Sequence, residues 1–231
     1  MIKKRIDIVF TGILLVLYVA FIGMDWLAPS LCLVSSTLKW CSIFLCNLYV
    51  WFVSKDTLLK ISLGITLLCD LLLLFGTREL SGLIGMALFC IVHVLHAVRA
   101  APQYEFGILI ASSFIAVGAL VVFSISSMLL VSQSALLSIG VCYSSLLMMN
   151  VGVSVQGMWK RWQPWPVSFL CATGALLFLL GDMFAGVDNA NHFFVLYKVN
   201  HANAGKMVWV FYLPAQWALA KSALNLRKKL A

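Results

Sequence analysis

The stretch Leu67–Leu74 reads LLCDLLLL and places Asp70 inside an apolar run with no neighbouring charge. A second stretch, Ala175–Met183, reads ALLFLLGDM and repeats this arrangement around Asp182. An ionisable residue inside a membrane-length segment costs at least ~2.5–3.5 kcal/mol on insertion scales, and such residues usually serve a function. The two carboxylates therefore indicate a shared polar site. The alternative is that each aspartate separately lines a helix interface and hydrogen-bonds locally.

The composition around these stretches is that of a membrane protein. The chain has 231 residues, of which 63% are hydrophobic and 10% are charged, and its mean hydropathy is +1.03. Ordinary soluble domains carry roughly 45–50% apolar and about 25% charged residues. We therefore expect a polytopic all-α membrane protein in which residues 1–231 form a single transmembrane helical domain.

Membrane-spanning helices are the elements that this apolar sequence predicts. A hydrocarbon core about 30 Å thick requires roughly 20 apolar residues in a helix. The segments that meet this requirement are 6–23, 37–53, 57–76, 80–98, 105–124, 130–156, 166–187 and 207–226. The first of them lacks a convincing small-x-small cleavage site, so we expect it to be retained as a span. The predicted fold is a bundle of eight transmembrane helices.

The basic residues predict the orientation of this bundle. The net charge of +8 comes mainly from the two ends of the chain and from short loops. With both termini cytoplasmic, the inner face carries twelve of the sixteen basic residues, and the outer face carries Lys39, Arg78, Lys198 and Lys206. This distribution satisfies the positive-inside rule. The basic residues therefore indicate the topology and not a nucleic-acid-binding surface. We expect a multi-pass protein of a bacterial inner membrane or an endomembrane.

In this topology the two aspartates lie at similar depth. Asp70 is about fourteen residues into the third span and Asp182 about sixteen into the seventh, and both spans run from inside to outside. Both carboxylates are thus predicted in the outer half of the membrane, where they face one cavity.

Other polar residues occur in the predicted spans. Lys39 opens the second span, either as a snorkelling lysine or as a cation for a phosphate or an aspartate. His93 and His96 lie one turn apart and suit helix–helix hydrogen bonds; the chain has four histidines, and we expect no metal site and no cofactor. Tyr212 and Gln216 share one face of the last span, where a glutamine normally finds a partner across the interface.

Four stretches give the chain a resemblance to the YhhN-type lysoplasmalogenase family, small eight-span enzymes of lipid metabolism. They are LLCDLLLLFG around Asp70, GLIGMALFCIVH up to His93, GALLFLLGDMFAGVD around Asp182, and YLPAQ with Tyr212 and Gln216. The third of them follows the family's pattern for the seventh span closely. Cys69 and Gly181 depart from the residues that usually precede the two aspartates, which leaves the choice of substrate open.

The resemblance implies hydrolysis of the vinyl ether bond of a lysoplasmalogen, giving a fatty aldehyde and glycerophosphoethanolamine or glycerophosphocholine. It implies Asp70 and Asp182 as catalytic acid and base. Lys39 is expected to meet the phosphate of the lysophospholipid, and His93, Tyr212 and Gln216 to orient the ether oxygen or the attacking water. Besides this substrate and the surrounding membrane lipid, no nucleic-acid partner is expected.

Paired carboxylates suit this chemistry. Glycoside hydrolysis likewise proceeds through an oxocarbenium ion, with one carboxylic acid as proton donor and one carboxylate as stabiliser or base. Two nearby aspartates at low dielectric do not both ionise cheaply, so one is expected to keep its proton. The same pair would also suit a small proton- or cation-coupled transporter or channel, or a hydrolase of another lysolipid. A purely structural or lipid-binding role is the remaining alternative.

Overall fold

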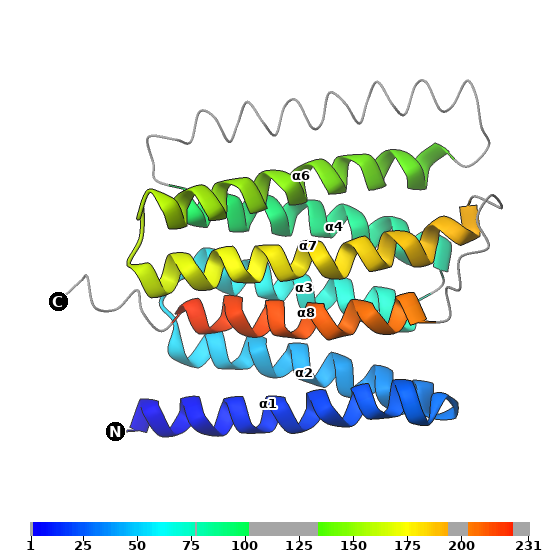
Figure 1. Ribbon diagram of the computed structural model, residues 1–231, viewed down its shortest axis with the longest axis horizontal. Helices are drawn as coiled ribbons and strands as arrows, with labels where there is room; N and C mark the ends of the chain where they lie inside the picture. Colours follow the sequence, from blue (N-terminus) through cyan, green and yellow to red (C-terminus); the bar gives the residue numbers. More distant parts are fainter. Residues whose placement is uncertain (1, 77, 102–133, 194–202, 224–231) are drawn as a thin grey trace.

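The computed structural model describes residues 2–76, 78–101, 134–193 and 203–223, and every regular element among them is a helix (Figure 1). The elements are α1 (Ile2–Leu27), the 3-10 turn η1 (Pro29–Leu31), α2 (Cys32–Val53), α3 (Thr57–Phe75), α4 (Arg78–Ala100), α6 (Ser134–Trp159), α7 (Trp165–Phe193) and α8 (Ala204–Lys221). Six of these described helices, α1 to α4, α6 and α7, are long and apolar enough to cross a membrane. The prediction of an all-α, multi-pass membrane protein is confirmed.

Seven of the predicted spans coincide with these helices, and the segment 105–124 lies outside the described residues. Two boundaries differ from the prediction. The turn η1 leads directly into α2, so Lys39 lies two turns inside that helix instead of at its start. Helix α7 continues to Phe193, so Asp188 belongs to a helix and not to the polar connection that follows the predicted span.

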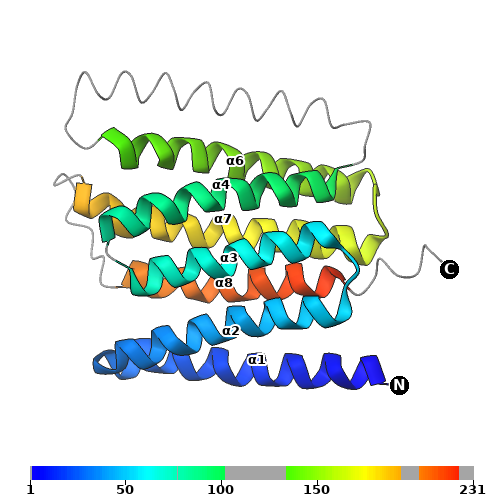
Figure 2. The same ribbon diagram turned by 180° about the vertical axis from the view of Figure 1, so that it is seen from behind.

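Six of the described helices form a closed ring. Around it, α2 packs on α3, α3 on α4, α4 on α6, α6 on α7, α7 on α8, and α8 on α2. Figure 1 shows α7 and α8 in front of α3 and α4, and Figure 2 shows the same arrangement from behind. Helix α1 packs outside this ring against α2 and α8. Side chains that point inward from six different helices therefore meet at the centre of the ring.

Helices α7 and α8 approach each other closely because α7 presents glycines to its neighbour. A Cβ atom added at Gly174 would lie 2.8 Å from Cγ of Leu219 and 3.2 Å from the carbonyl oxygen of Ala215. One at Gly181 would lie 3.3 Å from the carbonyl oxygen of Val208. Small residues at such interfaces let helix backbones pack tightly in a membrane, where the hydrophobic effect does not drive association.

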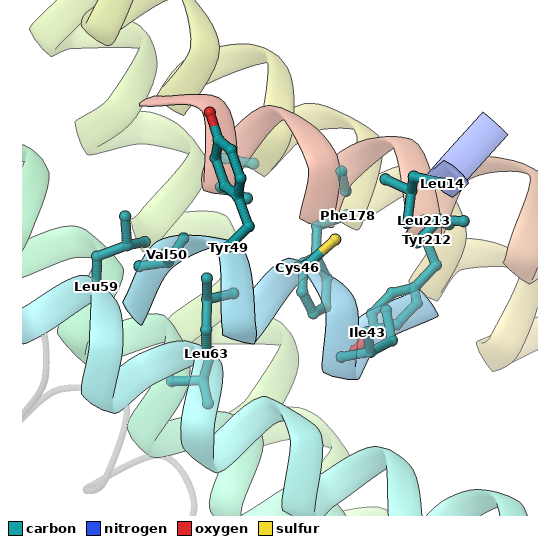
Figure 3. Close-up of a cluster of buried hydrophobic side chains, with 14 of the residues drawn as sticks. Leu14, Ile43, Cys46, Tyr49, Val50, Leu59, Leu63, Phe178, Tyr212 and Leu213 are labelled. Carbon is teal, nitrogen blue, oxygen red and sulfur yellow. The ribbon is translucent and has the colours of Figure 1, made fainter. Parts of the chain in front are cut away.

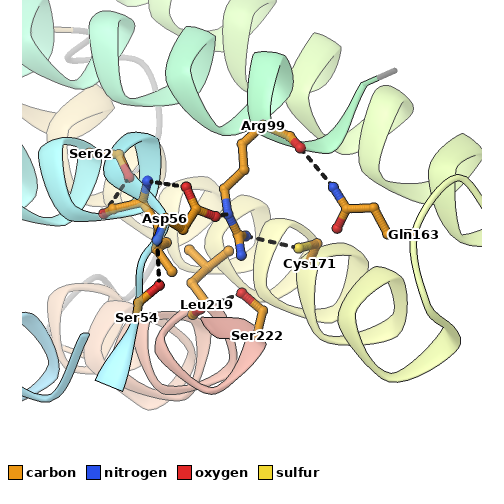
Figure 4. Close-up of polar contacts among 9 residues, drawn as sticks. Ser54, Asp56, Ser62, Arg99, Gln163, Cys171, Leu219 and Ser222 are labelled. Atoms are coloured by element: carbon orange, nitrogen blue, oxygen red, sulfur yellow. Dashed lines mark hydrogen bonds and ion pairs between the residues drawn. The ribbon is translucent and has the colours of Figure 1, made fainter. Parts of the chain in front are cut away.

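Polar contacts identify the two ends of the bundle. At one end, which we call the Arg99 end, the guanidinium of Arg99 pairs with Asp56 at 2.5 Å, and the Gln163 side chain donates to the carbonyl oxygen of Arg99 at 2.7 Å (Figure 4). An ion pair between Asp7 and Lys221 joins the start of α1 to the end of α8. We call the opposite end, where α1 gives way to α2 and α8 begins, the Lys39 end.

Local capping explains where α3 begins. The Asp56 side chain accepts a hydrogen bond from the backbone N–H of Leu59 at 3.1 Å and so satisfies one of the free donors of the first turn. The backbone N–H of Asp56 in turn donates to the Ser54 hydroxyl at 2.9 Å. This cap and the ion pair with Arg99 use the two oxygens of one carboxylate.

The interior of the bundle is apolar except for a few polar side chains. Ile43, Cys46, Leu63, Phe178 and Leu213 are buried and lie in one continuous cluster, and Figure 3 shows how they converge from several helices. Large apolar side chains also cover much of the outside, among them Val16 and Phe52. An apolar exterior of this extent suits a helix bundle in contact with lipid.

Candidate active site

Asp70 lies on α3 with its side chain directed into the helix ring, and only 3% of the residue is exposed. The hydroxyl of Tyr212, on α8, lies 2.9 Å from Oδ1 and 2.8 Å from Oδ2 of this carboxylate. The phenol therefore donates to the carboxylate from another helix of the ring. This hydrogen bond links α3 to α8.

Asp182 has the same kind of partner. It lies on α7, and its Oδ2 accepts a hydrogen bond from the hydroxyl of Tyr143 on α6. Asp182 is partly exposed, in contrast to Asp70. Each of the two carboxylates is thus held by a tyrosine from a different helix.

The ring brings the two carboxylates near one another. The carboxyl groups of Asp70 and Asp182 lie within electrostatic range of one another, and Tyr212 lies within range of both. In the sequence, Asp70 is more than a hundred positions away from both Asp182 and Tyr212. Only the closed ring, in which α2 packs on both α3 and α8 and α7 packs on α8, places them in one site.

Aromatic rings fill the space around the two Tyr–Asp pairs. Phe178 lies 5.1 Å from Tyr212 and 4.9 Å from His93 between ring centroids, and His93 lies 5.2 Å from Tyr143. Phe89 contacts all four of these rings at 5.7 to 6.4 Å. Because apolar rings displace water, the charges at this site interact at a lower effective dielectric constant than they would in solvent.

His93 joins this group from α4 and is completely buried. The side-chain amide of Asn150, on α6, lies 3.4 Å from its Nδ1. Its Nε2 is buried and has no hydrogen-bond partner among the described residues. This ring nitrogen is therefore available to a ligand or a water molecule at the site.

Gln216 follows Tyr212 by one turn of α8 and is also completely buried. Neither its amide nitrogen nor its amide oxygen has a hydrogen-bond partner within the described ranges. Leaving such a group unpaired costs about 1–3 kcal/mol. A glutamine kept in the interior at this cost is suited to contact a polar ligand.

Lys39 lies at the edge of this group. Its ammonium pairs with Asp25 at 2.7 Å, not with either candidate catalytic aspartate. It lies 5.3 Å from the ring of Trp209, which in turn lies 5.1 Å from the ring of Tyr212. Lys39 is 8% exposed, so it is a buried cation next to the site and does not snorkel toward the membrane surface.

Tyr143 and Asn150 are site residues that the sequence did not predict. Both lie on α6, where Tyr143 contacts Asp182 and Asn150 contacts His93. The only signal in the sequence is that a tyrosine and an asparagine seven residues apart fall on one face of a helix. That signal becomes informative only when α6 is known to pack between α4 and α7.

Two carboxylates, each hydrogen-bonded to a tyrosine and enclosed by a ring of apolar helices, define a multi-pass membrane protein with an acidic site between its helices. The chain belongs to the YhhN family, whose model matches residues 28–223. The match extends from η1 to α8 and includes every residue of the candidate site described above. Membership is consistent with a hydrolase. No curated protein and no solved structure matches the chain.

Proposed function

We propose that this protein is an intramembrane hydrolase that cleaves the vinyl ether bond of lysoplasmalogens. The observation that carries the proposal is the pair of Tyr–Asp contacts, Tyr212 with Asp70 and Tyr143 with Asp182, at the centre of one helix ring. Such a pair provides one carboxylic acid and one carboxylate at a site from which bulk water is largely excluded. The family supports a hydrolytic reaction.

The reaction requires these two states of a carboxyl group. The acid protonates the β-carbon of the vinyl ether, which leaves an oxocarbenium ion at the adjacent carbon. Water adds to that carbon and gives its proton to the carboxylate, forming a hemiacetal. The hydroxyl of the hemiacetal then gives up its proton while the bond to the glycerol oxygen breaks and that oxygen takes up a proton, which releases a fatty aldehyde and the glycerophosphoryl alcohol. No redox partner is needed.

The aromatic side chains, like the two aspartates, have a role in the proposed reaction. The oxocarbenium ion is a cation, and the rings of Phe89, Phe178 and Trp209 pack around the ring of Tyr212. An aromatic face attracts a desolvated cation by roughly 2 kcal/mol or more. We propose that these rings stabilise the intermediate and that the tyrosines hold the carboxylates in place.

The remaining site residues suit the polar parts of the reaction. His93, whose Nε2 has no described partner, contacts Tyr143, and Gln216 follows Tyr212 by one turn of α8; both are suited to orient the attacking water or the ether oxygen. Lys39 is proposed to attract the phosphate of the substrate from its position beside Trp209. We propose that the lipid enters on the side of Asp182, since this residue is less buried than Asp70.

We further propose eight spans with both termini in the cytoplasm. Helix α4 ends beside Gln163 at the Arg99 end, whereas α6 must begin at the Lys39 end because its own last turn lies next to Gln163. A further crossing between α4 and α6 would reconcile these positions. The distribution of basic residues then places the Arg99 end in the cytoplasm and the Lys39 end outside.

Aldehyde release from a lysoplasmalogen by the purified protein tests the proposal. We expect Asp70→Asn and Asp182→Asn each to lower turnover by roughly 10²–10⁴-fold, the usual contribution of acid–base catalysis. Asp7→Asn is the matched control, because it removes a carboxylate that pairs with Lys221 at the Arg99 end. Normal turnover in both site variants would disprove the assignment of Asp70 and Asp182.

The same preparation separates the other candidate functions. Cleavage of an ester lysolipid to a free fatty acid, without release of aldehyde, would indicate a hydrolase of another substrate. Proton or cation flux in proteoliposomes that depends on Asp70, together with no cleavage of either lipid, would indicate a transporter or channel.

A further inference from the structure

A cavity of about 180 Å³ lies at the Lys39 end of the bundle. It is bounded by the end of α1, the turn η1, the start of α2 and the first turn of α8, and its charged lining residues are Asp25, Lys39 and Lys206. Its volume is well above the roughly 10–15 Å³ that one water molecule requires on the same measure. A small polar group fits inside it.

The charges around this cavity are fixed in place. Asp25 accepts a hydrogen bond from the Ser35 hydroxyl at 2.5 Å through Oδ1 and pairs with Lys39 at 2.7 Å through Oδ2. The ammonium of Lys206, on α8, lies 5.2 Å from the ring of Trp26. Two ammonium groups from two different helices therefore reach one cavity, and each is positioned by a neighbour.

A second carboxylate lies close to the same cavity. A Cβ atom added at Gly205, one of the lining residues, would lie 3.3 Å from Oδ2 of Asp188 at the end of α7. The cavity thus combines two cations with two nearby carboxylates, Asp25 and Asp188. This pattern complements a zwitterion that carries a phosphate and an ammonium group.

The cavity lies at a suitable distance from the candidate active site. Lys206 and Tyr212 are six residues apart on α8, which corresponds to about 9 Å along the helix axis. Trp209 lies between them and contacts both Tyr212 and Lys39. This spacing is of the same order as the glycerol backbone that separates the phosphate of a lysophospholipid from its ether bond.

We propose that this cavity binds the zwitterionic headgroup of the lysophospholipid, with the phosphate between Lys39 and Lys206 and the ammonium facing Asp25 and Asp188. The identity of the lipid rests on the function proposed above, whereas the headgroup site itself requires no catalysis. It adds Lys206 and the cavity at the start of α8 to the residues that recognise the substrate.

Binding of non-hydrolysable analogues to the full-length protein in detergent tests the proposal. The two probes are 1-O-alkyl-lysophosphatidylethanolamine and 1-O-alkylglycerol, which has the same chain and no headgroup. We expect Lys206→Ala to weaken binding of the first about tenfold, as the loss of one charge-assisted contact implies, and to leave binding of the second unchanged. Lys60→Ala is the matched control, since Lys60 lies 5.1 Å from the ring of Trp51 at the Arg99 end, and it should bind both probes as the wild type does.

Two results would overturn the headgroup site. These are unchanged binding of the phospholipid analogue by Lys206→Ala and equal weakening of both probes. Failure of the proposed function gives a different result, because wild-type protein that releases no aldehyde would still show headgroup-dependent binding of the analogue.

Discussion

The hydroxyl of Tyr212 lies within 2.9 Å of both carboxylate oxygens of Asp70, across the gap between α8 and α3. Hydrogen bonds to a charged group contribute about 1.5–3 kcal/mol. This one fixes the position of a carboxylate that has no other hydrogen-bonding side chain described around it. Tyr212 therefore lines the site and is also a positioning residue for Asp70.

Removal of this hydroxyl tests that role. We expect Tyr212→Phe to lower the turnover of vinyl ether hydrolysis by roughly tenfold to a hundredfold, the rate equivalent of the lost hydrogen bond, while the protein stays folded. Tyr18→Phe is the control, because the hydroxyl of Tyr18, on α1, donates to the carbonyl oxygen of Val210 on α8, the helix that carries Tyr212. Equal turnover in the two variants, measured by aldehyde release, would contradict the positioning role.

Gln216 offers a test that separates stability from activity. Because both of its amide atoms are buried without partners among the described residues, Gln216→Leu removes a polar group that costs about 1–3 kcal/mol to bury. We expect the free energy of unfolding to rise or stay constant while turnover falls. A loss of stability in detergent would show instead that the amide has a structural partner.

The contact between α7 and α8 predicts an unequal response of two glycines. At Gly174 an added methyl group would lie 2.8 Å from Leu219, so Gly174→Ala should destabilise the protein by about 1–3 kcal/mol through overpacking. At Gly152, on α6, an added methyl group meets nothing within 4 Å. There the alanine should be neutral or stabilising by about 0.5–1 kcal/mol, the usual gain inside a helix. Thermal unfolding of both variants in the same detergent gives the comparison, and equal melting temperatures would contradict it.

The ion pair between Arg99 and Asp56 predicts a large effect on folding. Arg99 is 7% exposed, and besides Asp56 it contacts the sulfur of Cys171 at 3.1 Å (Figure 4). Arg99→Met leaves a carboxylate without its cation at the start of α3 and should destabilise the protein by about 3–5 kcal/mol.

Lys221→Met provides the comparison for this prediction. The pair between Lys221 and Asp7 lies at the same end of the bundle but is more exposed, with 29% of the aspartate side chain accessible. Its loss should therefore cost about 0–1 kcal/mol. If both variants unfolded at the same denaturant concentration, burial of the Arg99 pair would not be the source of its stability.

The class of fold follows from the amino-acid sequence alone, because apolar runs of membrane length form helices that satisfy their own backbone hydrogen bonds. The same sequence also places Asp70 and Asp182 deep in two such runs, where the cost of a charge marks them as unusual. The YhhN resemblance expected from the same stretches is confirmed by the family match.

Which side chains accompany these aspartates depends on how the helices pack, and the sequence did not predict it. Tyr143 becomes a partner of Asp182 because α6 packs on α7, and Lys39 is paired with Asp25 because η1 folds α2 back beside α1. Helical periodicity gives the face on which a residue lies but not the helix that this face meets. The ring of six helices supplies that information, since it depends on the packing of all of them together.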